Sequence, residues 1–162
     1  MRTSTLRTAI YLAAGVGLIV SIFAALEFYE ASLQSLCSIN AFFSCSTVDK
    51  SGQTSTLGIP DYLWGIGGFV LVLVVAGIAE SRSRERRWPV LLLALTTLGT
   101  AFSLYFFWVQ LAVIGAFCVV CASAYVFEWV AWVGVVALVR QTRSLTLGRN
   151  GDAPSDGETS TV

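Results

Sequence analysis

Four long apolar stretches constrain this chain more than any other feature of its sequence. They cover residues 8–28, 62–79, 88–109 and 117–139. About 20 apolar residues in helical conformation cross the roughly 30 Å hydrocarbon core of a bilayer. A backbone in lipid must satisfy its own hydrogen bonds, and these stretches lack the alternating pattern of barrel strands. Each stretch is therefore predicted to be a transmembrane helix.

The composition agrees with a membrane protein and argues against soluble classes. Hydrophobic residues make up 56% of the 162-residue chain and charged residues only 12%, whereas a typical soluble domain is about 25% charged. Ten basic residues balance ten acidic ones, so no net field attracts nucleic acid. We expect an all-α membrane protein, a four-transmembrane-helix bundle with no nucleic-acid partner.

The basic residues indicate how the bundle is oriented. With four spans, the arginines fall on one side of the membrane and Lys50 alone on the other; the arginines are Arg2, Arg7, Arg82, Arg84, Arg86, Arg87, Arg140, Arg143 and Arg149. The positive-inside rule makes the arginine side cytoplasmic, together with both termini. Residues 1–140 are expected to form the membrane domain. The polar residues 141–162 are expected to be a disordered cytoplasmic tail.

Four cysteines are the most reactive groups, and all fall on the extracytoplasmic side. Cys37 and Cys45 lie in the loop between the first and second spans, whereas Cys118 and Cys121 lie at the entrance to the fourth. Thiols outside the cytosol can form disulfides. The N–H groups at a helix start carry a partial positive charge that favours a thiolate, the species that attacks disulfides. The Cys118-x-x-Cys121 motif is therefore predicted to be redox-active.

Each cysteine pair alone also has a simpler interpretation. Cys37 and Cys45 could staple a loop, and Cys118 and Cys121 could form a static disulfide or be buried as small apolar residues. A structural zinc site is disfavoured by the seven-residue spacing in the loop. Two pairs on one side favour an electron relay from a soluble thiol protein to an acceptor in lipid. A quinone suits this role, because the chain has no histidine for haem and no soluble dinucleotide-binding unit for flavin.

These motifs resemble those of the vitamin K epoxide reductase family, including its prokaryotic disulfide-forming members. The resemblance runs from about Arg7 to Val139. It rests on three motifs in order: Cys37-x7-Cys45 followed by Ser51, Gly58-x-Pro60-x4-Gly65, and Cys118-x-x-Cys121 followed by Tyr125.

The resemblance implies a role for each of these residues. Cys37 receives electrons from a soluble thioredoxin-fold partner outside the cytoplasm, and Cys45 shuttles between Cys37 and Cys118. Cys121 is the sulfur next to the quinone ring. The remaining positions surround the quinone, with Tyr125 bonding a carbonyl and Ser51 stabilising the site. The acceptor is a menaquinone or ubiquinone in a prokaryotic cell membrane, without metal or flavin.

Asp61 departs from the family pattern, because the animal enzymes carry an Asn there that donates to the quinone. An ionised carboxylate only accepts hydrogen bonds. Quinone reduction is therefore favoured over the alternative, reduction of a quinone epoxide. Asp61 also has a simpler interpretation, since an acidic residue in a first turn complements the helix dipole. A second alternative is a non-catalytic four-span scaffold with two structural disulfides.

Helical spacing places Cys121, Tyr125 and Glu128 on one face of the fourth helix. An acidic residue inside a span is costly and marks a functional interior. Glu128 is expected to bond a neighbouring helix, with a proton relay for the quinone as the alternative. Glu27, near the outer end of the first span, is expected to be solvated.

Two further expectations concern the extracytoplasmic loop, which is predicted to cover the redox site. Three aromatic residues are predicted to be apolar walls of the quinone site: Phe42, Phe43 and Phe117. Residues 46–57, rich in Ser, Thr and Gly, are expected to supply the mobility that thiol exchange needs.

Overall fold

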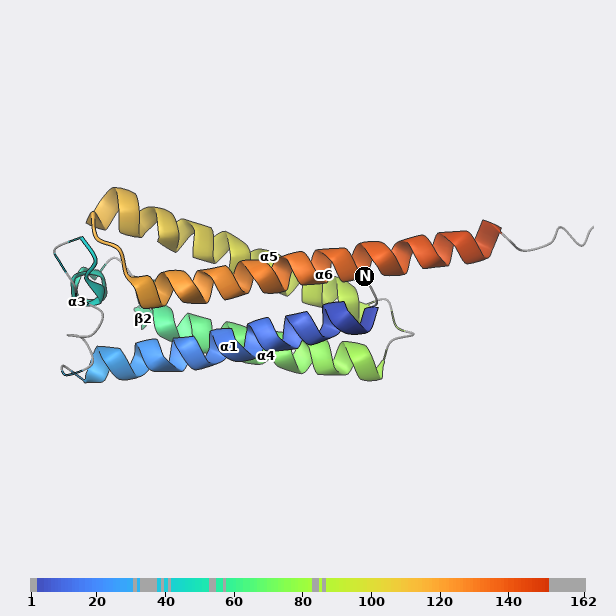
Figure 1. Cartoon of the computed structure of the whole chain (residues 1–162), viewed down its shortest axis with the longest axis horizontal. Helices are drawn as coiled ribbons and strands as arrows, with labels where there is room; N and C mark the ends of the chain where they lie inside the picture. The colour runs from blue at the N-terminus through green and yellow to red at the C-terminus, as the bar shows by residue number, and fades with distance from the viewer. Residues whose placement is uncertain are drawn as a thin grey trace, which may run out of the picture.

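Four long helices form a bundle in the computed structural model (Figure 1). It describes residues 3–30, 32, 38, 40, 42–52, 55–56, 58–82, 85 and 87–151. The long helices are α1 (Thr3–Tyr29), α4 (Asp61–Ser81), α5 (Arg87–Trp108) and α6 (Val119–Gly151). Each is long and apolar enough to cross a membrane. The predicted four-helix membrane bundle is confirmed.

Two helix ends lie further along the chain than the apolar stretches suggest. Helix α5 continues as a π-helical segment, η1 (Val109–Ile114). Helix α6 includes residues 141–151, which the predicted disordered tail also covered. This extension contains no proline, and its Leu, Arg and Gln residues are good helix formers. Residues 152–162 of that tail lie outside the described residues.

The helices pack through small residues along their length. Helix α1 contacts α6 and α4, and α5 contacts the same two helices. A Cβ added at Gly17 of α1 would lie 2.3 Å from the Phe69 ring of α4, and one at Gly134 of α6 would lie 3.0 Å from Ile10. Without a hydrophobic force between helices in lipid, such close approach supplies the packing energy.

The outward faces of the helices are as apolar as their interior. Leu12, Ile19, Leu98 and Val133 are 57–66% exposed. Many other large apolar side chains on these helices are exposed as well, and such a surface fits contact with lipid.

Short elements gather at one end of the bundle, opposite the N-terminus (Figure 1). They are α3 (Cys45–Lys50) and an antiparallel pair, β1 (Ser55–Thr56) and β2 (Ile59–Pro60). Gly58, in the turn between the two strands, has a φ of 78°, a conformation that glycine adopts at little cost. The hairpin ends at Pro60, whose fixed φ suits the entry to a helix, and so delivers Asp61 to the first turn of α4.

Candidate redox site

The loop before α3 is tied to the start of α6 by its backbone. The Ser44 N–H donates to the Phe117 carbonyl (3.2 Å), and the Phe117 N–H donates to the Phe42 carbonyl (2.7 Å). Phe43 and Phe117 form a parallel bridge. Ser44 caps α3, because its hydroxyl accepts from the Thr47 N–H at 3.3 Å. Helix α3 and its first residue, Cys45, are thereby fixed beside the entrance to α6.

This placement brings the sulfurs of two distant cysteines together. The distance from Cys118 Sγ to Cys45 Sγ is 3.1 Å. Both residues are buried, at 1% and 0% exposure, in a cluster with Val48 and Ala116. Cys45 is disulfide-bonded, whereas Cys118 and Cys121 are both in the thiol form. Cys37 lies outside the described residues.

Cys118 occupies the residue before α6, as a helix cap does. Its sulfur accepts a hydrogen bond from the Cys121 N–H at 3.2 Å. That N–H is one of the unsatisfied donors of the first helical turn. The predicted placement of the first sulfur of this motif near helix N–H groups is therefore seen directly.

Gln110 connects the thiols to the other polar groups of the site. It is fully buried in η1, and its Oε1 accepts from the Cys118 N–H at 3.0 Å. Its Nε2 donates to the Tyr125 hydroxyl at 3.2 Å, and that hydroxyl donates to Asp61 Oδ2 at 2.8 Å. One side chain thus fixes both the backbone at Cys118 and the hydroxyl of Tyr125.

The sequence interpretation missed Gln110. The available signal was an amide side chain at the end of an apolar stretch, where a polar group must find partners. Its orientation depends on the π-helical turn of η1 and on Gly115, which ends η1 with a φ of 69°. Neither feature has a reliable sequence signature, although π-turns are frequent at functional sites.

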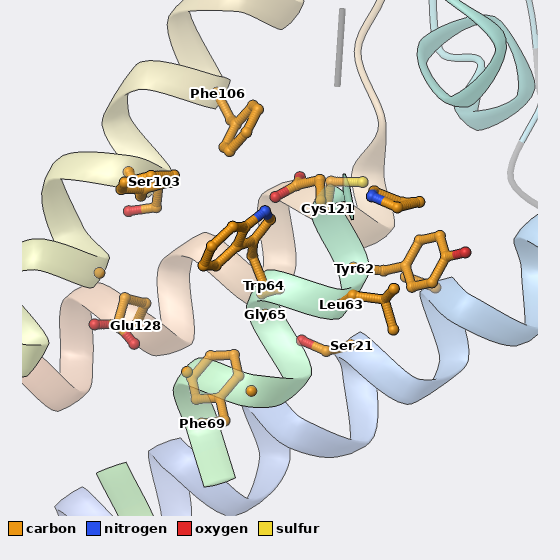
Figure 2. A pocket seen from close by; sticks show the side chains of 18 of the residues that line it. Ser21, Tyr62, Leu63, Trp64, Gly65, Phe69, Ser103, Phe106, Cys121 and Glu128 are labelled. Atoms are coloured by element: carbon orange, nitrogen blue, oxygen red, sulfur yellow. The ribbon is translucent and has the colours of Figure 1, made fainter. Parts of the chain in front are cut away.

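A cavity of about 690 Å³ opens beside Cys121 (Figure 2). Cys121, Tyr125 and Asp61 contribute to its wall, and most of the remaining lining is apolar. Besides Tyr125, the aromatic part of the lining consists of Phe28, Tyr62, Trp64, Phe69, Phe102 and Phe106. Ligand cavities commonly have this size, with apolar walls and a few polar groups that orient the ligand.

These residues fit a quinone. The ring of a quinone is flat and apolar, and its carbonyl oxygens accept hydrogen bonds. The aromatic walls suit the ring, while the polar side chains lie at separate points of the lining. Within the described residues, no group of three or more His, Cys, Asp and Glu side chains could hold a metal ion.

Three residues lie in surroundings that the sequence alone did not indicate. Ser51 is absent from the lining of this cavity, because its hydroxyl donates to the Val48 carbonyl (2.7 Å) at the end of α3. It supports the helix that carries Cys45 rather than the space beside Cys121. Glu27 is 1% exposed, so the prediction that it is solvated is wrong. Glu128 Oε1 has no hydrogen-bond partner among the described residues, so the expected bond to a neighbouring helix is not found at this atom.

The predicted aromatic walls are also in a different place. Phe42 stacks on Phe117 with their ring centroids 6.4 Å apart, and Phe43 meets Phe117 edge to face. None of the three lines the cavity beside Cys121. They cover the junction between the loop and α6 instead, because the backbone bonds of Phe42 and Phe117 hold their rings together.

The predicted mobile segment, residues 46–57, is partly regular. It contains most of α3 and the strand β1. Residues 53, 54 and 57 of that segment lie outside the described residues.

Comparison with protein families identifies a matching family. The sequence model described as the vitamin K epoxide reductase family matches residues 8–136. This range includes the four cysteines, Gln110 and the polar residues of the cavity wall.

Proposed function

Because this chain belongs to the vitamin K epoxide reductase family, whose members are membrane oxidoreductases of thiols and quinones, we propose that it oxidises a thioredoxin-fold protein and reduces a membrane quinone. The observation that carries the proposal is the 3.1 Å separation of Cys118 Sγ and Cys45 Sγ, with Cys121 at the cavity wall. Exchange between a thiol and a disulfide requires contact of this kind.

The electrons follow the four sulfurs in order. The dithiol of the partner reduces the Cys37–Cys45 disulfide and becomes a disulfide itself. The Cys45 thiolate then attacks Cys118 of a Cys118–Cys121 disulfide, and Cys121 leaves as a thiolate. Cys37 attacks Cys45 next, which restores the loop disulfide and leaves Cys118 and Cys121 reduced.

The last step returns the inner pair to its oxidised form. A bound quinone supplies the acceptor for two electrons. When the Cys118–Cys121 disulfide re-forms, two electrons and two protons leave the pair, and the product is a hydroquinone. The disulfide at Cys45 and the thiols of the inner pair correspond to the state just before this step.

The surrounding side chains hold the reacting groups in place. Gln110 fixes the Cys118 backbone and the Tyr125 hydroxyl through its two ends. Tyr125 and Asp61 present oxygen atoms at the cavity wall beside Cys121. We assign Gln110 as a positioning residue and Tyr125 as the donor to one quinone carbonyl, its hydroxyl proton turning from Asp61 to the carbonyl when the quinone binds.

The cysteine end faces away from the cytoplasm in this proposal. Arg7, Arg82 and Arg87 all belong to the opposite end of the bundle, where α1 begins and α4 joins α5 (Figure 1). The positive-inside rule makes that end cytoplasmic. The protein would then support disulfide formation in exported proteins from the cell membrane of a prokaryote.

Two reductants of different size test the proposed path of electrons through the four cysteines. Purified protein is given menadione as acceptor, with either reduced thioredoxin or dithiothreitol as donor. Cys37→Ser should lose menadione reduction by thioredoxin but keep reduction by dithiothreitol, which reaches the inner pair directly. Cys121→Ser should lose both. Thioredoxin oxidation at the wild-type rate by Cys37→Ser would contradict the role of the loop.

A trapped intermediate tests the contact between the pairs. Cys37→Ser leaves the Cys45–Cys118 bond without its resolving thiol, and Cys121→Ser leaves Cys118 to attack the loop disulfide. Both variants should accumulate a Cys45–Cys118 disulfide, detected by mass spectrometry of unreduced peptides. Cys45→Ser is the control that cannot form it. Absence of this linkage from both variants would contradict direct exchange.

A further inference from the structure

Glu128 lies on α6 within the wall of the cavity, deeper along the helix than Cys121 (Figure 2). It is 9% exposed, and its Oε1 is buried without a hydrogen-bond partner among the described residues. An unpaired polar atom in an apolar interior destabilises the fold, because it has lost its hydrogen bonds to water and gained none in return. Such an atom in the wall of a ligand cavity indicates a partner that arrives with the ligand.

The space for this carboxyl group comes from a glycine on the facing helix. A Cβ added at Gly99 of α5 would lie 2.5 Å from Glu128 Oε1. The described lining contains no Lys or Arg, and its other carboxylate is Asp61, which accepts from Tyr125. Without a positive partner, burial favours the neutral acid, which has an O–H to donate.

Glu128 and Tyr125 line the same cavity from one face of α6. The two residues are three positions apart on α6, so they share one face at an axial separation of about 4.5 Å. A para-quinone carries its two carbonyl oxygens at opposite ends of its ring, so a ring held at one oxygen has a second acceptor to offer. Tyr125 and Glu128 thus offer polar groups at two points of a largely apolar wall.

We propose that Glu128 is a second polar contact for the quinone, donating a hydrogen bond to the carbonyl opposite the one held by Tyr125. The inference rests on the proposed function, since it requires a quinone in this cavity. It assigns a ligand to the carboxyl oxygen that the fold leaves unpaired, and it explains why α5 has a glycine where the carboxyl group lies.

Infrared spectroscopy of bound menadione tests the contact without turnover. Menadione labelled with ¹³C at either carbonyl gives one band for each, and a hydrogen bond lowers the frequency of its band. In wild type both bands should be lowered. Tyr125→Phe should raise one band towards its unbound position, and Glu128→Leu should raise the other. Glu128→Gln keeps a donor and should leave the second band near its wild-type position.

Binding affinity gives an independent measure. Glu128→Leu should bind menadione about tenfold more weakly, as expected for the loss of one hydrogen bond. Glu80→Leu is the matched control, because Glu80 lies at the other end of α4 and outside the cavity lining. Its affinity and both carbonyl bands should stay at wild-type values. Gly99→Ala, whose added methyl would displace Oε1, should shift the same band as Glu128→Leu.

The outcomes separate this inference from the proposed function. If wild type binds menadione but Glu128→Leu and Gly99→Ala leave both bands and the affinity unchanged, the second contact is wrong while the quinone site stands. If wild type binds no menadione, the proposed function and this contact fall together. If Glu128→Leu does not fold, the Gly99→Ala variant is judged by the same measurements. Unchanged carbonyl bands and affinity in that variant would show that the second contact is wrong.

Discussion

The two ends of the bundle stabilise their polar groups in opposite ways. At the cysteine end, Gln110 is fully buried and bonds both the Cys118 backbone and Tyr125. At the other end, Arg7 and Glu80 form an ion pair of 3.4 Å with side chains 39% and 51% exposed. In the adjoining connection, a hydrogen bond from Arg87 lowers the pKa of Glu85, whose carboxylate is solvated.

The two ends differ in what happens when a polar group loses its hydrogen-bond or ion-pair partner. A buried donor or acceptor that loses its partner remains unsatisfied, whereas an exposed ion is solvated by water. Polar groups at the cysteine end therefore fix atomic positions, and those at the other end contribute little to stability. Substitutions of polar groups should therefore have larger effects at the cysteine end than at the end that carries Arg7 and Glu80.

The largest effect is expected at Cys118. Cys118→Ala removes the sulfur in contact with Cys45, so menadione reduction should be abolished with thioredoxin and with dithiothreitol alike. Ser123→Ala is the matched control, because the Ser123 hydroxyl bonds only the Val120 carbonyl of its own helix in the described structure. Turnover of menadione measures both variants, and substantial activity in Cys118→Ala would place the reacting sulfur elsewhere.

Gln110→Leu should have the next largest effect. It leaves the Cys118 N–H and the Tyr125 hydroxyl without this partner inside the bundle, at a cost of about 1–3 kcal/mol in unfolding free energy. Menadione affinity and the rate of Cys45–Cys118 exchange should both decrease, because Gln110 contacts both sites. Thr97→Val, which removes a more exposed bond from Trp132, is the control and should change neither. A variant that lost stability but kept both functions would show that Gln110 has only a structural role.

Two glycines in the middle of α1 test packing independently of hydrogen bonds. Gly17→Ala places a methyl group 2.3 Å from the Phe69 ring, which must move, so we expect a loss of about 1–3 kcal/mol. Gly15→Ala meets nothing within 4 Å and should be neutral or slightly stabilising, since Ala favours helix. Unfolding in detergent compares the pair. Equal stability of the two variants would contradict tight packing of α1 on α4.

The smallest effect is expected at Glu80. Glu80→Gln removes the exposed ion pair with Arg7, which is worth about 0–1 kcal/mol. The midpoint of thermal unfolding in detergent should change little, and the change should disappear at high salt. A large loss at Glu80 would contradict the contrast between the two ends.

Much of the site was predictable from spacing along the chain. The intervals between Cys118, Cys121, Tyr125 and Glu128 place the last three on one helical face, and the last three all line one cavity. The predicted apolar walls were wrong, because the contact between Phe42 and Phe117 depends on backbone pairing between segments about 75 residues apart in sequence. Gln110 was missed for a related reason. The turn between η1 and α6 determines which groups its side chain can reach, and the sequence does not reveal that turn.

The sequence by itself determined four membrane helices, because apolar length and backbone satisfaction in lipid leave few other structures. It also determined which residues could carry redox chemistry, since cysteine is the most reactive residue type present. Only the tertiary structure decided that Cys45 meets Cys118, that Gln110 joins the thiols to Tyr125, and that Glu128 Oε1 has no described partner. These facts depend on contacts between distant segments, where a shift of one ångström makes or breaks a hydrogen bond, and local sequence patterns do not encode such distances.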